Sequence, residues 1–195
     1  MPFSRFGKRT YRFRLPQRLL AARIKAMRIA IFGGSFNPPG RHHRAIADVL
    51  AREFDEVRVI PCGPRPDKAV TGIIPAIYRA ALADLAFGGM PKIVVDLFDL
   101  EQATFTRNWE LQERFAPMGE VWHVVGTDLI AGGSRGASPI QTSWAKGTEL
   151  WQNAHFAVLQ RPGHDIDAND LPPHSKLIPL DVPGSSTEIR DRLGR

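Results

Sequence analysis

The chain has 195 residues, of which 43% are hydrophobic and 24% charged, a balance typical of a soluble globular protein with one domain and a buried core. No apolar run approaches the roughly 20 residues that cross a bilayer, so a membrane role is not expected. Cys62 is the single cysteine, which excludes an internal disulfide, and no Cys/His cluster has the spacing of a zinc site. A lone cysteine fits a reducing compartment, and we expect a cytoplasmic protein.

The net charge of +6 comes from the N-terminal segment. Residues 1–26 hold eight of the 26 lysines and arginines and none of the 20 aspartates and glutamates, which leaves 18 basic and 20 acidic residues for the rest of the chain. Three interpretations stay open: an extension from a misassigned start, since Met27 directly precedes the first predicted strand; a basic arm for acidic surfaces; or a targeting segment. We predict a flexible extension over 1–26, a domain over 27–195, and no nucleic-acid partner.

Short apolar runs rich in Val, Ile or Phe recur along this domain and alternate with helical stretches. The predicted strands are 28–33, 56–61, 92–98, 120–126 and 154–160. Ile46, Val49, Leu50 and Phe54 recur at the spacing of one helix face, and Pro75 favours the start of a second helix. This alternation predicts an α/β fold, a Rossmann-like doubly wound parallel sheet with helices on both faces. Ala131–Pro139 and Pro162–Pro173 are predicted loops near the carboxyl ends of the strands.

The first predicted strand leads into Gly33-Gly34-Ser35-Phe36-Asn37-Pro38-Pro39 and then into His42 and His43 at a helix start. Small residues let backbone N–H groups approach an anion, and the helix dipole adds about half a positive charge, so the arrangement favours phosphate binding. It matches neither the dinucleotide fingerprint nor the P-loop. A tight strand-to-helix connection with exposed histidines is the alternative interpretation.

A second motif, Ser185-Ser186-Thr187-Glu188-Ile189-Arg190, lies near the C-terminus. Ser185 and Glu188 have the spacing of a capping box for a terminal helix. The remaining hydroxyls and the guanidinium of Arg190 one turn later are groups that a polyphosphate requires. The capping role and a phosphate-binding role are compatible with each other.

With these motifs the chain resembles the nucleotidyltransferase superfamily, whose motifs are (H)xGH and ISSTxIR. Within it the chain most resembles the nicotinate/nicotinamide mononucleotide adenylyltransferases, over roughly residues 27–193. Further matching stretches, in chain order, are Pro66-Asp67-Lys68, Tyr78-Arg79-Ala80-Ala81-Leu82, Phe105-Thr106, Gly126-Thr127-Asp128, Trp144 and Arg161-Pro162-Gly163. Three departures stand out. Gly40 occupies the place of the first motif histidine and His42 that of the motif glycine, Asn37 replaces a common Asp, and 108–110 breaks the usual Thr-Leu.

The resemblance implies transfer of AMP from ATP to nicotinate or nicotinamide mononucleotide, with release of pyrophosphate, in NAD biosynthesis. Mg²⁺ would enter with ATP, with no resident metal, and the chemistry would be mostly positioning and charge stabilisation. The implied catalytic residues are His43, Lys68 and Arg190. The implied ATP-binding residues are Gly33, Gly34, Ser35, Phe36, His43, Gly126, Asp128, Arg161, Ser186, Thr187 and Arg190. The implied mononucleotide-binding residues are Ser35, Asn37, Lys68, Thr106 and Trp144.

Two other functions remain open. One is another small-molecule adenylyltransferase, such as a phosphopantetheine adenylyltransferase, although Trp144 with the later Arg-Pro-Gly argues against it. The other is a nucleotide-binding protein that has lost efficient catalysis, with Gly40 as the mark. His123 and His155 lie in predicted strands and are interpreted as structural. The sequence does not separate nicotinate from nicotinamide, and an oligomer is possible.

Overall fold

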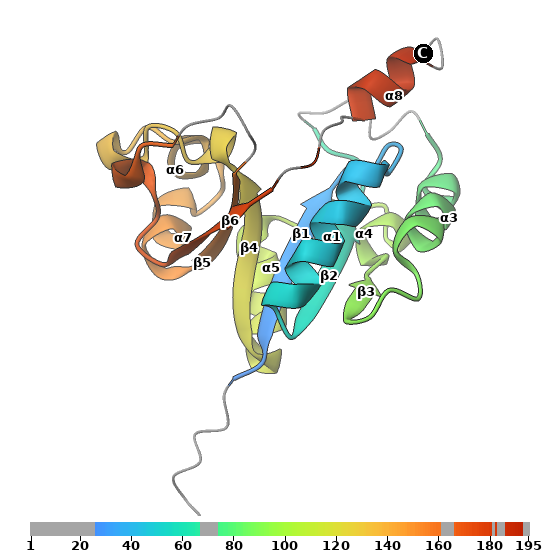
Figure 1. Ribbon diagram of the computed structural model, residues 1–195, viewed down its shortest axis with the longest axis horizontal. Coiled ribbons are helices and arrows are strands. Elements are labelled where there is room, and N and C mark those ends of the chain that lie inside the picture. Colours follow the sequence, from blue (N-terminus) through green and yellow to red (C-terminus); the bar gives the residue numbers. More distant parts are fainter. Residues whose placement is uncertain (1–25, 67–73, 161–165, 181, 183–185, 193–195) are drawn as a thin grey trace, which may run out of the picture.

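The computed structural model describes residues 26–66, 74–160, 166–180, 182 and 186–192 (Figure 1). Its strands form one parallel sheet in the order β3-β2-β1-β4-β5-β6. The strands are β1 (Arg28–Gly34), β2 (Glu56–Pro61), β3 (Ile93–Val95), β4 (Glu120–Gly126), β5 (His155–Gln160) and β6 (Ser175–Pro179). The order reverses between β1 and β4, and in such sheets ligands bind beyond the carboxyl ends of the strands at that point. The Rossmann-like doubly wound fold is therefore confirmed.

Helices cover both faces of the sheet. The helices are α1 (Arg41–Glu53), α3 (Ala76–Phe87), α4 (Phe98–Glu101), α5 (Asn108–Phe115), α6 (Pro139–Ser143), α7 (Gly147–Asn153) and α8 (Ser186–Arg192). Alternate residues of β1 point to opposite faces, so Ala30 and Phe32 pack with α1 and α3 while Ile29 and Ile31 pack with α5. A separate apolar cluster under α6 and α7 continues the core across β4 and β5. In the described part of the chain, no helix is both long and apolar enough for a membrane span.

Four predicted strands match the structure to within one residue at each end, and the other differences have local causes. The predicted strand 92–98 ends at Val95, because the Asp96 carboxylate accepts a hydrogen bond from the Phe98 N–H and α4 begins there. β6 is absent from the prediction, because Ser175, Lys176 and Pro179 interrupt its short apolar pattern. It lies at the sheet edge beside β5, where polar residues and proline are tolerated.

The buried side chain of Arg79, on α3, holds the turn after β1 against the end of β2. Its Nη2 donates to the carbonyl oxygens of Ser35 and Cys62, both at 2.6 Å, and Arg79 is only 1% exposed. Carbonyl oxygens removed from water need such donors, because an unmet buried acceptor is costly. Arg79 thus fixes the position of the Gly33–Ser35 turn relative to the sheet.

We expect Arg79→Met to lower the free energy of unfolding by about 3 kcal/mol, because it leaves two buried carbonyl groups without a charged donor. Urea denaturation followed by circular dichroism measures the effect. Arg44→Met is the matched control. Arg44 is exposed and donates to Ala86 at 3.3 Å, so its loss is expected to cost less than about 0.5 kcal/mol. Equal losses in the two variants would contradict the role given to Arg79.

Candidate active site

The turn between β1 and α1 carries the first motif. Gly33 is exposed, and a Cβ on Gly34 would lie 3.1 Å from the ring of Phe36. Phe36 adopts a φ of 41° and turns its side chain into the core, against Phe32 and Phe87. The Gly40 N–H donates to Nδ1 of His43 at 3.0 Å, which caps the start of α1 with the imidazole. Since Nδ1 accepts, the proton of the neutral ring lies on Nε2, a donor of the kind that phosphate oxygens require.

The second motif meets the first at this turn. Ser186 Oγ donates to the Pro38 carbonyl at 3.0 Å, and Arg190 Nη1 donates to the Asn37 carbonyl at 2.7 Å. Figure 1 shows α8 beyond the carboxyl end of β1. Two segments about 150 residues apart in the chain therefore lie together around one turn. This is the placement that a shared triphosphate site requires.

The packing of α8 also accounts for Gly40. A Cβ at this position would lie 2.7 Å from Cδ1 of Ile189 and 2.8 Å from Cε1 and Nδ1 of His42. The φ of Gly40 is −113°, which any residue adopts, so the constraint is space rather than backbone freedom. His42 is 6% exposed and packs its ring 3.9 Å from that of His43. His42 thus fills, with Ile189, the space that a side chain on residue 40 would need.

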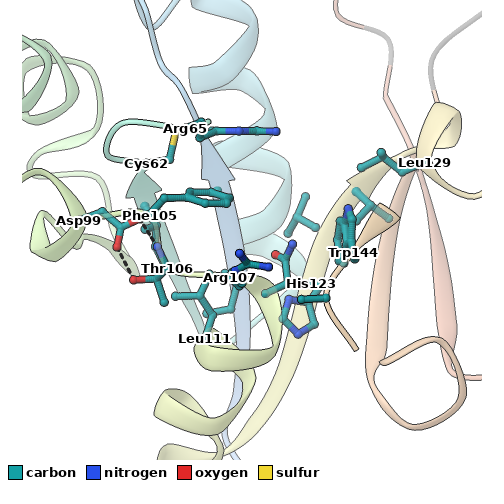
Figure 2. Close-up of a pocket in the computed structure, with 18 of the residues that line it drawn as sticks. Cys62, Arg65, Asp99, Phe105, Thr106, Arg107, Leu111, His123, Leu129 and Trp144 are labelled. Atoms are coloured by element: carbon teal, nitrogen blue, oxygen red, sulfur yellow. Dashed lines mark hydrogen bonds between the residues drawn. The ribbon is translucent and has the colours of Figure 1, made fainter. Parts of the chain in front are cut away.

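A cavity of about 550 Å³ opens beside the same turn, on the face of the sheet that α5 covers (Figure 2). Gly33 and Gly34 line it, together with Thr106 and Trp144. Its volume is in the range of small-molecule sites. Trp144 follows α6 and is half-buried, and Figure 2 shows its ring at one wall of the cavity, with Thr106 at the other. Gly33 and Gly34 therefore belong both to the cavity lining and to the turn after β1 that the sequence predicts to bind phosphate.

The chain resembles known adenylyltransferases over most of its length. The family model described as cytidylyltransferase-like matches residues 31–192. A probable nicotinate-nucleotide adenylyltransferase of Leifsonia xyli is 34% identical over 86% of this chain and 82% of its own length. The Plasmodium falciparum nicotinic acid mononucleotide adenylyltransferase complexed with NaAD is similar in structure, with a TM-score of 0.65, 25% identity, and 85% and 83% of the two chains covered. The chain belongs to the nicotinate-nucleotide adenylyltransferase family.

The residues that the family motifs single out include two further groups. Some are described but do not present a side chain to the turn or the cavity, and others lie outside the described residues. Lys68, Arg161 and Ser185 fall in the second group, as does the side chain of Thr187 and nearly all of the basic extension. Gly126 ends β4, and a Cβ there would overlap the exposed carboxylate of Asp128. The side chains of Phe36 and Asn37 are buried, so their contribution to a ligand site would come through the backbone or a change of side-chain position. The roles of these residues in this adenylyltransferase stay predictions.

Asp99 is a cavity residue that the sequence did not reveal. This buried carboxylate accepts hydrogen bonds from both the N–H and the Oγ1 of Thr106, and so holds the segment leading into α5. Asp99 lies in a run of mixed apolar and acidic residues, where no spacing distinguishes it from its neighbours. Arg65 also lines the cavity, with its guanidinium 5.3 Å from the centre of the Phe105 ring. Arg107, the residue before α5, lines it too, and its backbone N–H donates to the Glu110 carboxylate. These two cations form a positive rim of the cavity.

The 131–139 segment, which leads into α6 and Trp144, is tied to the chain before β6. The Asp170 carboxylate accepts from the N–H of Gly132 at 2.8 Å, and from the N–H and Oγ of Ser134 at 3.0 and 2.7 Å. These hydrogen bonds lower the pKa of Asp170 to about 2. The predicted loop contains a short 3-10 turn over Gly133–Arg135, and α6 starts at its last residue, Pro139.

His123 lies on β4 at the cavity, buried to 1% exposure, with Nε2 3.0 Å from Oε1 of Gln112 on α5. The sequence indicated a structural histidine, and its burial is consistent with that. Burial lowers the pKa of His123 from its ordinary value of 6.5 to about 4. The ring is therefore neutral throughout the physiological range.

We expect the free energy of unfolding to fall between pH 6.5 and pH 4, by up to on the order of 3 kcal/mol from His123 alone. The unfolded chain takes up a proton near pH 6.5 and the folded chain only near pH 4, so acid favours the unfolded state in this window. Urea titrations at pH 7, 5.5 and 4.5 measure the slope. His123→Phe should flatten it, whereas His155→Phe on the neighbouring strand should leave the difference in place. A slope unchanged by His123→Phe would contradict the assignment.

Proposed function

We propose that this protein transfers AMP from ATP to nicotinate mononucleotide, releasing pyrophosphate, in the synthesis of NAD. The observation that carries the proposal is the shared turn: Gly33 and Gly34 line the cavity, while His43 and Arg190 lie around the same turn. The names of the relatives and the dinucleotide in the Plasmodium structure support the substrate pair. A triphosphate on the turn and a mononucleotide in the cavity would meet at these glycines.

In the proposed reaction an oxygen of the mononucleotide's 5′-phosphate attacks the α-phosphorus of ATP. The new O–P bond forms in line with the bond to the β-phosphate oxygen, which breaks, and pyrophosphate leaves with that electron pair. His43, through its Nε2–H, and Lys68 would donate to the α- and β-phosphates, while Ser186, Thr187 and Arg190 would hold the outer phosphates. Gly126 and Asp128 would meet the adenosine ribose. Mg²⁺ would arrive as the complex with ATP and neutralise part of the triphosphate charge.

The cavity side of the proposal concerns the pyridine ring. Trp144 offers an aromatic face at the wall of the cavity, and a positively charged pyridinium ring stacks well on such a face. The cations Arg65 and Arg107 at the rim favour a ligand with negative charge, as nicotinate mononucleotide has on its phosphate and carboxylate. The positive rim thus favours the nicotinate substrate over the neutral carboxamide.

The direct test is pyrophosphate release from ATP and Mg²⁺ with nicotinate mononucleotide and, separately, with nicotinamide mononucleotide. We expect turnover with the first and a lower kcat/KM with the second. Product formation is checked by chromatography of the dinucleotide. Turnover with neither mononucleotide would reject the proposal and favour a protein that binds nucleotides without reacting them.

Trp144→Ala is expected to raise the KM for the mononucleotide about tenfold or more, because loss of a stacking face costs on the order of 1–2 kcal/mol. The KM for ATP should change less than about twofold. Trp109→Ala is the matched control, since Trp109 packs beside the same apolar cluster and under Lys146, and is not among the residues that line the cavity. An equal rise in both variants would show that Trp144 acts through folding and not through the ligand.

Gly40 supports the second function considered, a family member with impaired catalysis, because one motif histidine is missing. The packing of Ile189 and His42 against residue 40 instead favours a locally rebuilt working site. We therefore expect Gly40→His to lower kcat/KM at least about tenfold, since the new side chain must displace α8 or His42. Steady-state kinetics of the variant decides the point. A rise of several orders of magnitude from a near-zero baseline would establish the impaired protein.

A further inference from the structure

One histidine that lines the cavity has a buried ring nitrogen for which the described part of the chain supplies no hydrogen-bond partner. It is Nδ1 of His123, whose side chain is 1% exposed. The other nitrogen, Nε2, is 3.0 Å from Oε1 of Gln112, so one edge of the ring is held by α5. A buried polar atom is normally paired, so this nitrogen is a candidate partner for a ligand, which a small turn of the ring toward the cavity would let it reach.

The residues nearest to His123 on the sheet and on α5 are mostly apolar. His123 pairs in register with Ile31 of β1, and Ile31, Leu111 and Val125 line the cavity beside it. The ring of Phe156 lies 5.9 Å away, on β5. These neighbours offer no hydrogen-bonding side chain to Nδ1, which leaves it without a partner in the described part of the chain. Figure 2 shows His123 between Thr106 and Trp144, at the same cavity as the proposed stacking face.

The hydrogen bond between Gln112 and His123 can form with either of two proton arrangements. Its amide presents either an oxygen or an NH₂ group, and a neutral imidazole carries its proton on either nitrogen. With the amide oxygen on Nε2–H, as in the structure, Nδ1 is an acceptor. With the amide turned over, Nε2 accepts and Nδ1–H is a donor. The first state suits a carboxamide NH₂ group and the second a carboxylate oxygen.

We propose that His123, positioned by Gln112, hydrogen-bonds through Nδ1 with the carboxylate or carboxamide on the pyridine ring of the mononucleotide and helps set the preference between them. This rests on the proposed function, which places the pyridine ring on Trp144. The site then has an aromatic wall for the ring and a polar floor for its substituent. His123 is a specificity-determining residue in this scheme, and Gln112 is a positioning residue.

The test compares His123→Phe with the wild type, with both mononucleotides. Phenylalanine keeps an aromatic ring in the apolar surroundings but has no nitrogen. We expect the KM for the preferred mononucleotide to rise about tenfold, kcat and the KM for ATP to stay within about threefold, and the ratio of kcat/KM for the two mononucleotides to move towards one. Gln112→Leu should give a smaller change in the same direction. His155→Phe, on the neighbouring strand and not among the cavity-lining residues, should change none of these quantities.

A direct readout is the ¹⁵N NMR spectrum of His123 in the wild type during titration with each mononucleotide, because the shifts of Nδ1 and Nε2 report which nitrogen carries the proton. A change at Nδ1 on binding supports the inference. An unchanged KM and an unchanged ratio in a folded His123→Phe variant would overturn it, while leaving adenylyl transfer intact. If the wild type turns over neither mononucleotide, the proposed function fails. If in addition neither titration shifts the His123 signals, the inference fails with it.

Discussion

The site depends on the hydrogen bonds that the backbone carbonyl groups of the turn after β1 accept. The Ser35 carbonyl is bound by Arg79 from α3, and the Asn37 carbonyl by Arg190 from α8. In a trans peptide the carbonyl of one residue and the N–H of the next point in opposite directions, so the hold on Ser35 turns the Phe36 N–H away from Arg79. Two guanidinium groups from distant parts of the chain thus help to fix the geometry of this backbone segment, together with the buried side chain of Phe36.

The same turn separates two kinds of chemistry. His43 lies towards the face of the sheet that α1 covers, next to Phe32 and Phe36, whereas the cavity lies on the face that α5 covers. The strand order reverses between β1 and β4, so the connections after these two strands run to opposite faces and leave a crevice at their carboxyl ends. In the proposed function the phosphates would lie at the carboxyl ends of the strands, beside a cavity lined by both apolar and charged residues. The reactants would meet at the glycines alone.

Much of this was predictable from the sequence, for physical reasons that differ by element. Buried parallel strands leave continuous apolar runs, so β1, β2, β4 and β5 were found almost to the residue, while the edge strand β6 left too weak a pattern. The glycine turn and the serine and arginine of α8 were singled out as groups that a phosphate requires, and the structure brings them together, while their binding of phosphate stays a prediction. Asp99 could not be predicted, because its importance lies in a hydrogen bond to Thr106 that only the tertiary fold creates. The role of His123 likewise depends on Gln112, which no local spacing connects with it.

The carboxylate of Asp170 holds the chain ahead of Trp144 through backbone and hydroxyl donors rather than through a cation. Dissolved ions screen attraction between opposite charges over distances near the Debye length, but they weaken a short hydrogen bond to a neutral donor much less. The aromatic wall of the cavity therefore keeps its place across a wide range of ionic strength. The proposed contact of Arg190 with the outer phosphates would join full charges, so we expect concentrated salt to weaken this part of the site first.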